Sequence, residues 1–262
     1  MKSIIPFLFL LFFFIDSFSQ DNFKVIKVNG TILLKSRNIS LETGTVFSEK
    51  EDLQFRTEDA TAAVINSQRG RMILTNNNHD LSTASSNYLP SMYNISSRGG
   101  SLVNIVDLQN HFSGKYVVLG RQAIEMDVKN FPMDKDNFFF LRYIFKGEEI
   151  NKKLGYSGDT LIIDKRSLYT VDGNPIPSPD NTSIRLFYRK GSESIAVSEF
   201  DLIFPDIRQL TKEIQIILDE FKNKSFTEKF AEVTSYINEE YGKINKGNLL
   251  TWLDINFGLK AK

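Results

Sequence analysis

The chain has 262 residues and no net charge, because 32 Lys and Arg residues balance 32 Asp and Glu residues. This balance argues against a nucleic-acid-binding protein, since contact with many phosphates requires concentrated positive charge. The chain has no cysteine, which excludes disulfides, a thiol nucleophile, a zinc–thiolate site and lipid attachment at an N-terminal cysteine. Hydrophobic residues make up 41% and charged residues 24%, as in a folded protein of one large or two modest domains.

The N-terminus has the layout of a secretory signal. Lys2 supplies the positive charge, residues 4–15 form an apolar run, and Ser17-Phe18-Ser19 places small residues before a cleavage site. The run is too short to cross a bilayer as a helix, which takes about 20 residues. We therefore predict that residues 1–19 are a cleaved signal peptide, that the mature chain begins at Gln20, and that it resides in the periplasm or on the outer surface. A short membrane anchor or a buried helix is the alternative.

Later segments contain no apolar stretch long enough for a membrane-spanning helix, so we expect none in the mature chain. The Phe-rich signal and the Asn-, Lys- and Ile-rich body resemble secreted proteins of the Bacteroidetes. Asp159-Thr160-Leu161 resembles the short O-glycosylation pattern of such proteins. The chain also has five sequons for N-glycosylation, which matter only in a host that glycosylates Asn: Asn29, Asn38, Asn94, Asn181 and Asn223.

Residues 20–75 predict a small β-domain. Apolar residues alternate from Lys24 to Leu34, as in a half-buried strand, and Asn29-Gly30 interrupts this stretch as a tight turn or bulge. A second apolar strand is predicted over 60–65 and a returning strand over 72–74, with Arg69-Gly70 in the turn between them.

The order of motifs in residues 24–75 resembles the periplasmic domain of FecR-type sensor proteins. It comprises a Val-x-Gly strand, Leu41-Glu42-Thr43-Gly44, a strand ending at Thr57, the Ala-rich strand 60–64 and a closing strand 72–74. The resemblance implies a small β-domain. Arg69-Gly70 stands where Asp-Gly is common in that family. The chain also lacks the membrane helix and cytoplasmic segment of such sensors, so sigma-factor signalling is not implied.

Residues 76–101 are rich in Asn and Ser, which favours a linker, although a functional long loop is the alternative. Residues 102–204 carry strand signals at regular intervals, beginning with Val103–Leu108, and predict an immunoglobulin-like β-sandwich. We interpret Phe138-Phe139-Phe140 as a strand buried on both faces in preference to a binding patch.

Residues 205–262 change to a helical period. Apolar residues recur three or four apart from Ile207 to Phe221 and from Phe226 to Ile244, which predicts two amphipathic helices, and a short third helix is expected over 249–257. Asp206 with Gln209 and Ser225 with Glu228 have the spacing of capping boxes. We expect the helical pair to pack on the β-sandwich and complete its core; a partner-binding arm is the alternative.

Candidates for catalysis are sparse. His79 and His111 lack a second His at metal-ligand spacing, although either could join a spatial Ser-His-Asp triad. We interpret Ser157 as a turn residue and Asp134-Lys135-Asp136-Asn137 as a solvated turn in preference to a metal loop. The acidic pairs Glu148-Glu149 and Glu239-Glu240 have the character of surface residues, and whether two acids converge in a cleft is left open.

Together these patterns predict an α+β, mainly β protein with a small N-terminal β-domain, an immunoglobulin-like β-sandwich and a C-terminal α-helical pair. We expect an exported, non-enzymatic protein-binding or scaffold component of the bacterial envelope whose partners are other envelope proteins. No residue is predicted to be catalytic, to bind a cofactor or to ligate a metal. The alternatives are a secreted hydrolase of glycans or peptides and an accessory of a periplasmic signalling system.

Overall fold

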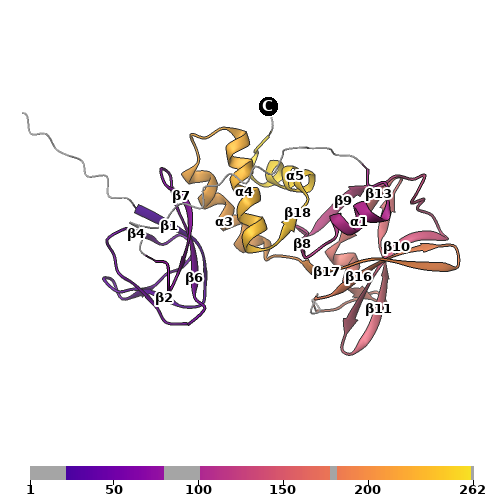
Figure 1. Ribbon diagram of the computed structural model, residues 1–262, viewed down its shortest axis with the longest axis horizontal. Helices are drawn as coiled ribbons and strands as arrows, with labels where there is room; N and C mark the ends of the chain where they lie inside the picture. Colours follow the sequence, from indigo (N-terminus) through magenta and orange to yellow (C-terminus); the bar gives the residue numbers. More distant parts are fainter. Residues whose placement is uncertain (1–21, 80–100, 178–181, 261–262) are drawn as a thin grey trace, which may run out of the picture.

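The computed structural model describes residues 22–79, 101–177 and 182–260 (Figure 1). The predicted signal peptide 1–19 with its cleavage site, most of the predicted linker 76–101, and the sequons at Asn94 and Asn181 lie outside the described residues. The fold is α+β and mainly β, as predicted. An N-terminal β-unit and a larger second β-unit lie on either side of the C-terminal helices (Figure 1).

The N-terminal β-unit consists of two small sheets around one apolar core. One sheet has the strand order β4-β1-β6-β7 and the other β3-β2-β5. Gly30 makes the turn between β1 and β2 with φ +76°, and a Cβ there would lie 3.0 Å from the Cβ of Ala60, so only glycine fits. The strands are β1 (Asn22–Asn29), β2 (Ile32–Leu34), β3 (Ile39–Ser40), β4 (Val46–Ser48), β5 (Leu53–Phe55), β6 (Thr61–Asn66) and β7 (Gly70–Thr75).

The second β-unit has a six-stranded sheet of order β11-β10-β16-β17-β8-β18 and a three-stranded sheet of order β12-β13-β9. Side chains of both sheets share one core, which includes Phe139, Leu141 and Ile163. The strands are β8 (Lys115–Val117), β9 (Arg121–Glu125), β10 (Asn137–Phe145), β11 (Glu148–Lys153), β12 (Gly155–Ser157), β13 (Thr160–Asp164), β14 (Thr170–Val171), β15 (Asn174–Pro175), β16 (Ile184–Lys190), β17 (Glu193–Ile203) and β18 (Lys243–Ile244).

The second β-unit differs from the sequence prediction in two places. Residues 103–108 were expected to form a strand, but most of them lie in helix α1 (Ile105–His111). The reason is local: the Asn104 side chain accepts a hydrogen bond from the backbone N–H of Asp107 (2.9 Å) and so caps a helix that buries Leu108. In addition, β8 runs parallel to β17 and to β18, whereas immunoglobulin-like sheets are antiparallel. A second short helix, α2 (Lys165–Leu168), follows β13.

Three helices form the C-terminal region, and the helical pair is confirmed. They are α3 (Ile207–Glu220), α4 (Phe226–Glu240) and α5 (Lys246–Phe257). Ser225 and Glu228 make the predicted capping box of α4. Asp206 caps α3 by accepting from the N–H groups of Arg208 and Gln209. The Gln209 side chain does not complete a box, because it donates instead to Thr43 and to the carboxylate of Glu213.

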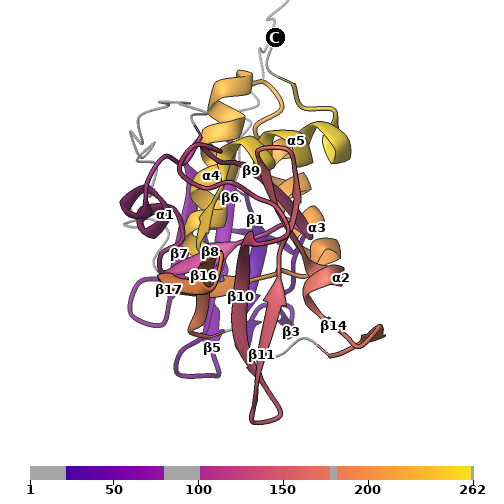
Figure 2. The same cartoon turned by 90° about the vertical axis from the view of Figure 1, so that its right-hand side faces the viewer.

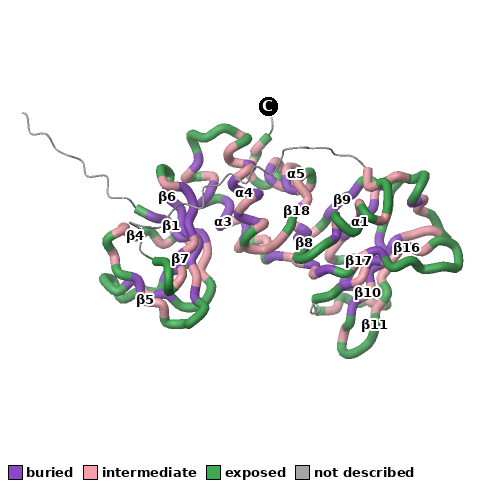
Figure 3. Tube along the Cα trace, viewed as in Figure 1, coloured by how far each residue is buried: buried purple, intermediate pink, exposed green. Residues whose placement is uncertain are grey.

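Helices α3 and α4 pack on the N-terminal sheet as well as on the second β-unit, whereas packing on the β-sandwich was predicted. Their apolar side chains share a core with Ile26 of β1, Ala63 and Ile65 of β6, and Val117 of β8. Strand β6 is therefore buried on both faces, and Figure 3 shows this buried seam between strands and helices. Figure 2, turned by 90°, shows α4 and α5 in the upper part of the view. Because this core combines residues of β6, β8 and the helices, the packing crosses the predicted boundaries at 75/76 and 204/205.

The helices are joined to the second β-unit by backbone contacts. Strand β18 follows α4 and extends the six-stranded sheet beyond β8. Gly242, at φ +123°, lies so close to Lys115 that a Cβ would come within 2.5 Å of the Lys115 backbone oxygen. The Asn248 side chain of α5 donates to the carbonyl of Ala123 and accepts from its N–H (2.9 and 3.0 Å), which satisfies the exposed edge of β9.

Two buried polar clusters lie between the N-terminal sheet and the helices. Arg71 of β7 is 2% exposed and contacts Glu232 (2.6 Å) and Glu239 (2.5 Å) of α4, with Ser235 as a third partner. Burial alone would lower the pKa of Arg71, but the two carboxylates raise it above its ordinary value.

The second cluster surrounds Glu213 of α3, which is fully buried. It accepts hydrogen bonds from the hydroxyls of Tyr236 (2.8 Å) and Tyr241 (2.6 Å) and from Gln209. Burial, together with the nearby charge of Glu213, raises the pKa of both tyrosines, so their hydroxyls stay protonated and donate. Three side chains thus donate hydrogen bonds to this carboxylate, as the burial of a polar group requires.

We expect Arg71→Met to lower the free energy of unfolding by about 3 kcal/mol or more, because it leaves Glu232 buried without its countercharge. Chemical denaturation of the wild type and the variant measures this loss. Adding Glu232→Gln to Arg71→Met removes the unpaired charge and should recover part of the stability. A loss below about 0.5 kcal/mol, the range of ordinary surface substitutions, would contradict a structural role for this cluster.

Candidate functional site

The chemistry-bearing residues singled out in the sequence lie apart from one another. His79 is in an exposed turn after β7, where its Nδ1 lies 2.8 Å from the carbonyl of Asn76 and its ring packs against Phe55. His111 is at the end of α1 in the second β-unit. Ser157 ends the exposed strand β12. These positions do not bring a serine, a histidine and a carboxylate together within the described ranges.

The acidic candidates have local partners. The carboxylate of Asp134 accepts hydrogen bonds from Asn137 and Asp136, and these bonds, those from Asn137 first, lower its pKa. This is the geometry of a polar turn leading into β10. Glu239 binds Arg71 and Glu240 binds Lys27 (3.3 Å), both against the N-terminal sheet. Across residues 22–79, 101–177 and 182–260, no group of His, Asp and Glu side chains has the geometry to hold a metal ion.

A buried polar contact joins His111 to β8 and β9. The Gln122 amide donates to the Tyr116 hydroxyl, and that hydroxyl lies 2.6 Å from Nε2 of His111. With its oxygen accepting from Gln122, the tyrosine hydroxyl has its proton free to donate to Nε2 of a neutral His111. Burial, and then the charge of Lys243, lowers the pKa of His111 to about 4. His111 is thus a neutral hydrogen-bond acceptor of the core and lacks the character of a general base near neutral pH.

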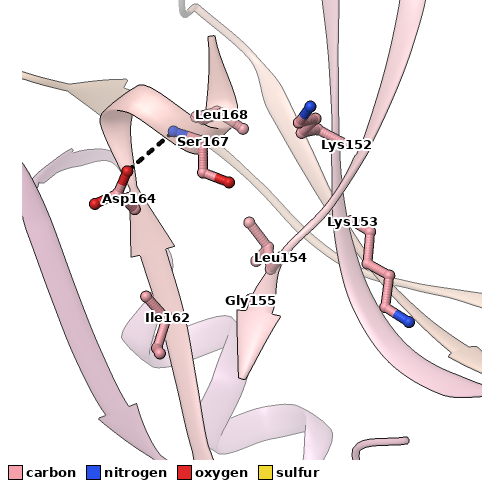
Figure 4. A pocket seen from close by; sticks show the side chains of 8 residues that line it. All are labelled: Lys152, Lys153, Leu154, Gly155, Ile162, Asp164, Ser167 and Leu168. Atoms are coloured by element: carbon pink, nitrogen blue, oxygen red, sulfur yellow. Dashed lines mark hydrogen bonds between the residues drawn. The ribbon is translucent and has the colours of Figure 1, made fainter. Parts of the chain in front are cut away.

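A shallow hollow lies between the end of β11 and helix α2 (Figure 4). Its polar side chains already have structural partners: Asp164 caps α2 by accepting from the N–H of Ser167 (2.9 Å), and Lys152 donates to the carbonyl of Thr170. Figure 4 shows Lys153 directed away from Ser167 and Asp164. The hollow therefore offers no group of convergent, unoccupied polar side chains to a ligand.

The outer face of the six-stranded sheet carries a different arrangement, which we call the arginine–phenylalanine face. Because side chains alternate along a strand, β10 and β16 each send every second residue to this face. The strand register places Arg142 beside Arg185 and Phe140 beside Phe187, with Lys153 next to Phe140 on β11. The face comprises Phe138, Phe140, Arg142, Glu149, Asn151, Lys153, Arg185, Phe187 and Arg189.

Cationic side chains cover the aromatic rings of this face. The rings of Phe140 and Phe187 stack with centroids 5.0 Å apart and an interplanar angle of 6°. The Lys153 ammonium lies 4.0 Å from the centre of the Phe138 ring, and the Arg142 guanidinium lies 4.8 Å from that of Phe187. Such cation–π contacts at partly exposed positions hold the cations in place above an apolar surface.

One carboxylate, Glu149, bridges the two central arginines. Its oxygens lie 2.8 Å from Arg185 and 3.4 Å from Arg142, and Arg142 also donates to Asn151 (2.7 Å). Glu149 is about half exposed (48%), so each of these pairs contributes only about 0–1 kcal/mol. An open hollow lined by Arg142, Ile144, Ser183 and Arg185 borders this bridge. A competing carboxylate could therefore displace Glu149 at little cost.

The face ends at a strand that has one unpaired edge. Within the described ranges, β11 is the edge of the sheet and pairs with β10 alone. The N–H of Leu154 donates to the carbonyl of Phe139 (2.9 Å), so these two residues form a hydrogen-bonded pair. Hydrogen-bonded and non-hydrogen-bonded pairs alternate along antiparallel strands. Therefore Glu149, Asn151 and Lys153 belong to non-hydrogen-bonded pairs. The N–H and C=O groups of these three residues point away from β10. Their side chains lie on the arginine–phenylalanine face.

The sequence interpretation of the phenylalanine run was correct for only part of it. Phe139 (1% exposed) and Phe140 (8% exposed) are buried on opposite faces of β10, as predicted, whereas Phe138 is only half-buried on the outer face. The remaining residues of the face were missed. The alternation Arg185-x-Phe187-x-Arg189 was the available signal, because it marks one face of a strand.

No family model matches the chain, and neither the curated proteins nor the solved structures include a match. No helix within the described ranges has the length and the apolar character needed to cross a membrane. The assignment of a function therefore depends on the geometry of the chain itself.

We expect His111 to make stability depend on pH. Its folded pKa of about 4 lies below its unfolded value of about 6.5, so the unfolded state binds the proton first and stability falls as the pH drops from 6.5 towards 4. Between pH 7 and pH 5 the free energy of unfolding of the wild type should fall by about 2 kcal/mol more than that of His111→Gln, a variant whose side chain can still accept a hydrogen bond from Tyr116. Denaturation at both pH values measures the difference, and equal losses would contradict the prediction.

Proposed function

We propose that the chain is an exported, non-enzymatic protein-binding or scaffold component of the bacterial envelope. The observation that carries this proposal is the arginine–phenylalanine face, which combines ordered cations, apolar rings and an open strand edge on one side of the molecule. Exposed strand edges invite pairing with another chain, and arginine and aromatic side chains are enriched at protein interfaces. The signal layout of residues 1–19 supports export.

Two aspects of the structure favour binding over catalysis. Among the described residues, His79 contacts a backbone carbonyl and His111 contacts the hydroxyl of Tyr116, whose pKa is raised by burial, so neither contact has the form of an activated nucleophile and its base. Two acids do converge, Glu232 and Glu239, but Arg71 lies between them and is itself buried. A secreted hydrolase of glycans or peptides therefore has less support. An accessory role in periplasmic signalling is supported only by the FecR-like order of residues 24–75.

We expect the mature protein to begin at Gln20. Intact-mass measurement of the protein recovered from the producing cells should give the mass of residues 20–262. Replacing the small residues before the cleavage site, with Ser17→Leu and Ser19→Leu together, should block cleavage and leave the precursor. A wild-type protein that keeps Met1 would contradict export through this signal.

We expect a specific envelope complex to depend on the arginine–phenylalanine face. Tagged mature protein would be cross-linked in gently solubilised envelope and its partners identified by mass spectrometry. Arg142→Glu together with Arg185→Glu should remove the main stoichiometric partner, because the reversed charges repel what the arginines attract. Arg121→Glu, an exposed charge reversal on β9 in the other sheet, is the matched control and should retain the partner. Recovery of the protein alone in every case would contradict the scaffold proposal.

A further inference from the structure

We propose that the arginine–phenylalanine face binds an extended, acidic segment of a protein partner, which adds as a strand to the edge of β11 and displaces Glu149 from Arg142 and Arg185. This inference rests on the proposed protein-binding function and specifies the chemistry of the partner. Three features of the face support it: its charge, the position of Glu149 and the direction of the edge backbone groups.

The charge of the face favours an acidic ligand. Arg142, Arg185, Arg189 and Lys153 bring four positive charges to it, against three carboxylates: Glu149, Glu199 opposite Arg185, and Asp134 beside Lys153. Arg189 donates to the carbonyl of Gly191 (2.7 Å), and no carboxylate of a described residue forms an ion pair with it. The net positive charge of the face contrasts with the neutral chain as a whole. An acidic partner is attracted to this face, whereas a basic one is repelled.

Glu149 shows where an incoming carboxylate would bind. It lies on the strand edge, is half exposed, and reaches both guanidinium groups. A partner's carboxylate in the same place would accept from the same two arginines, and charge-assisted bonds of this kind are the stronger class of hydrogen bond. Glu149 therefore acts as an internal competitor, and removing its charge favours the external acid.

The edge backbone restricts the ligand to a peptide. Glu149, Asn151 and Lys153 present N–H and C=O groups at every second residue, a repeat of about 6.6–6.8 Å that an extended peptide matches. A peptide strand at this edge sends alternate side chains to the arginine–phenylalanine face, where acidic residues meet Lys153 and the two arginines. The charged residues of β11 also act against indiscriminate pairing, because a partner with the wrong charge pattern is repelled.

Other polyanions fit the face less well. Nucleic acid needs several cations along a phosphate backbone and exposed rings for stacking, but Glu149 and Glu199 interrupt the positive charge. The rings are also covered: Phe140 is only 8% exposed, and Lys153 and Arg142 lie over Phe138 and Phe187. The phenylalanine rings of this face therefore leave little open surface on which a sugar could stack. The combination of covered rings, paired arginines and an open strand edge favours an acidic peptide.

The test measures fluorescence anisotropy of labelled octapeptides titrated with the full mature protein. One peptide alternates Glu and Val, and a second alternates Lys and Val. We expect the acidic peptide alone to bind, with an affinity that falls as salt is raised. Arg142→Ala and Arg185→Ala should each weaken binding about three- to five-fold, the range of an exposed ion pair. Glu149→Gln should strengthen binding by a similar factor, and Arg121→Ala should leave it unchanged.

If the Glu149 bridge had only a structural role, Glu149→Gln would weaken binding of the acidic peptide, because loss of the bridge would disorder the arginines. Strand addition is tested with two further acidic peptides, one N-methylated at its odd positions and the other at its even positions. Only every second N–H of an added strand bonds to the edge, so one of these peptides should lose binding and the other should keep it. Binding of the basic peptide, equal loss for both methylated peptides, displacement by single-stranded DNA or no binding at all would overturn the inference. If the envelope complex nevertheless forms and survives the face substitutions, the scaffold proposal stands and only this site is wrong.

Discussion

The relative position of the N-terminal sheet and the C-terminal helices depends on the buried ion cluster of Arg71. Taking a guanidinium and a carboxylate out of water is costly, and the cost is offset only where the partners are close and well oriented. Arg71 meets this condition with two carboxylates and a hydroxyl from one side of α4. Apolar packing of Ile26, Ala63 and Ile65 supplies the attraction between the two layers. The ion cluster determines the position of α4 along the sheet, because a shifted helix would leave a buried charge without its partner.

The same helices also connect the two β-units, and this connection determines which surfaces remain free. Strand β18 extends the sheet at β8, and Asn248 covers the edge of β9. One face of the N-terminal sheet is buried beneath α3 and α4. By contrast, no helix of the described residues packs on the outer face of β10 and β16, and only the end of β11 faces a helix, α2, across a hollow. The position of the arginine–phenylalanine face is thus a consequence of where the C-terminal region packs.

The arginine–phenylalanine face and the interior use the same residue types in different ways. In the interior, Arg71 and Glu213 are surrounded by fixed partners, so their charges serve stability and cannot exchange. On the face, Arg142 and Arg185 share one half-exposed carboxylate, and their pairing is weak enough to be exchanged. Burial alone separates these two roles. An acidic segment from another protein can compete for the second arrangement but has no access to the first.

Local patterns in the sequence were sufficient for the class of fold, the Asn29-Gly30 turn, the capping of α4 and the absence of any chemistry that requires cysteine. Each depends on residues close together in the chain, where periodicity and capping act directly. The helix at 105–111 was missed because the Asn104 cap outweighed a short apolar alternation that suggested a strand. The partner of Arg71, the surface on which α3 packs and the pairing of Arg142 with Arg185 were decided only by the tertiary structure. These contacts join residues far apart in the chain, and their energies depend on burial and distance, which a linear pattern does not contain.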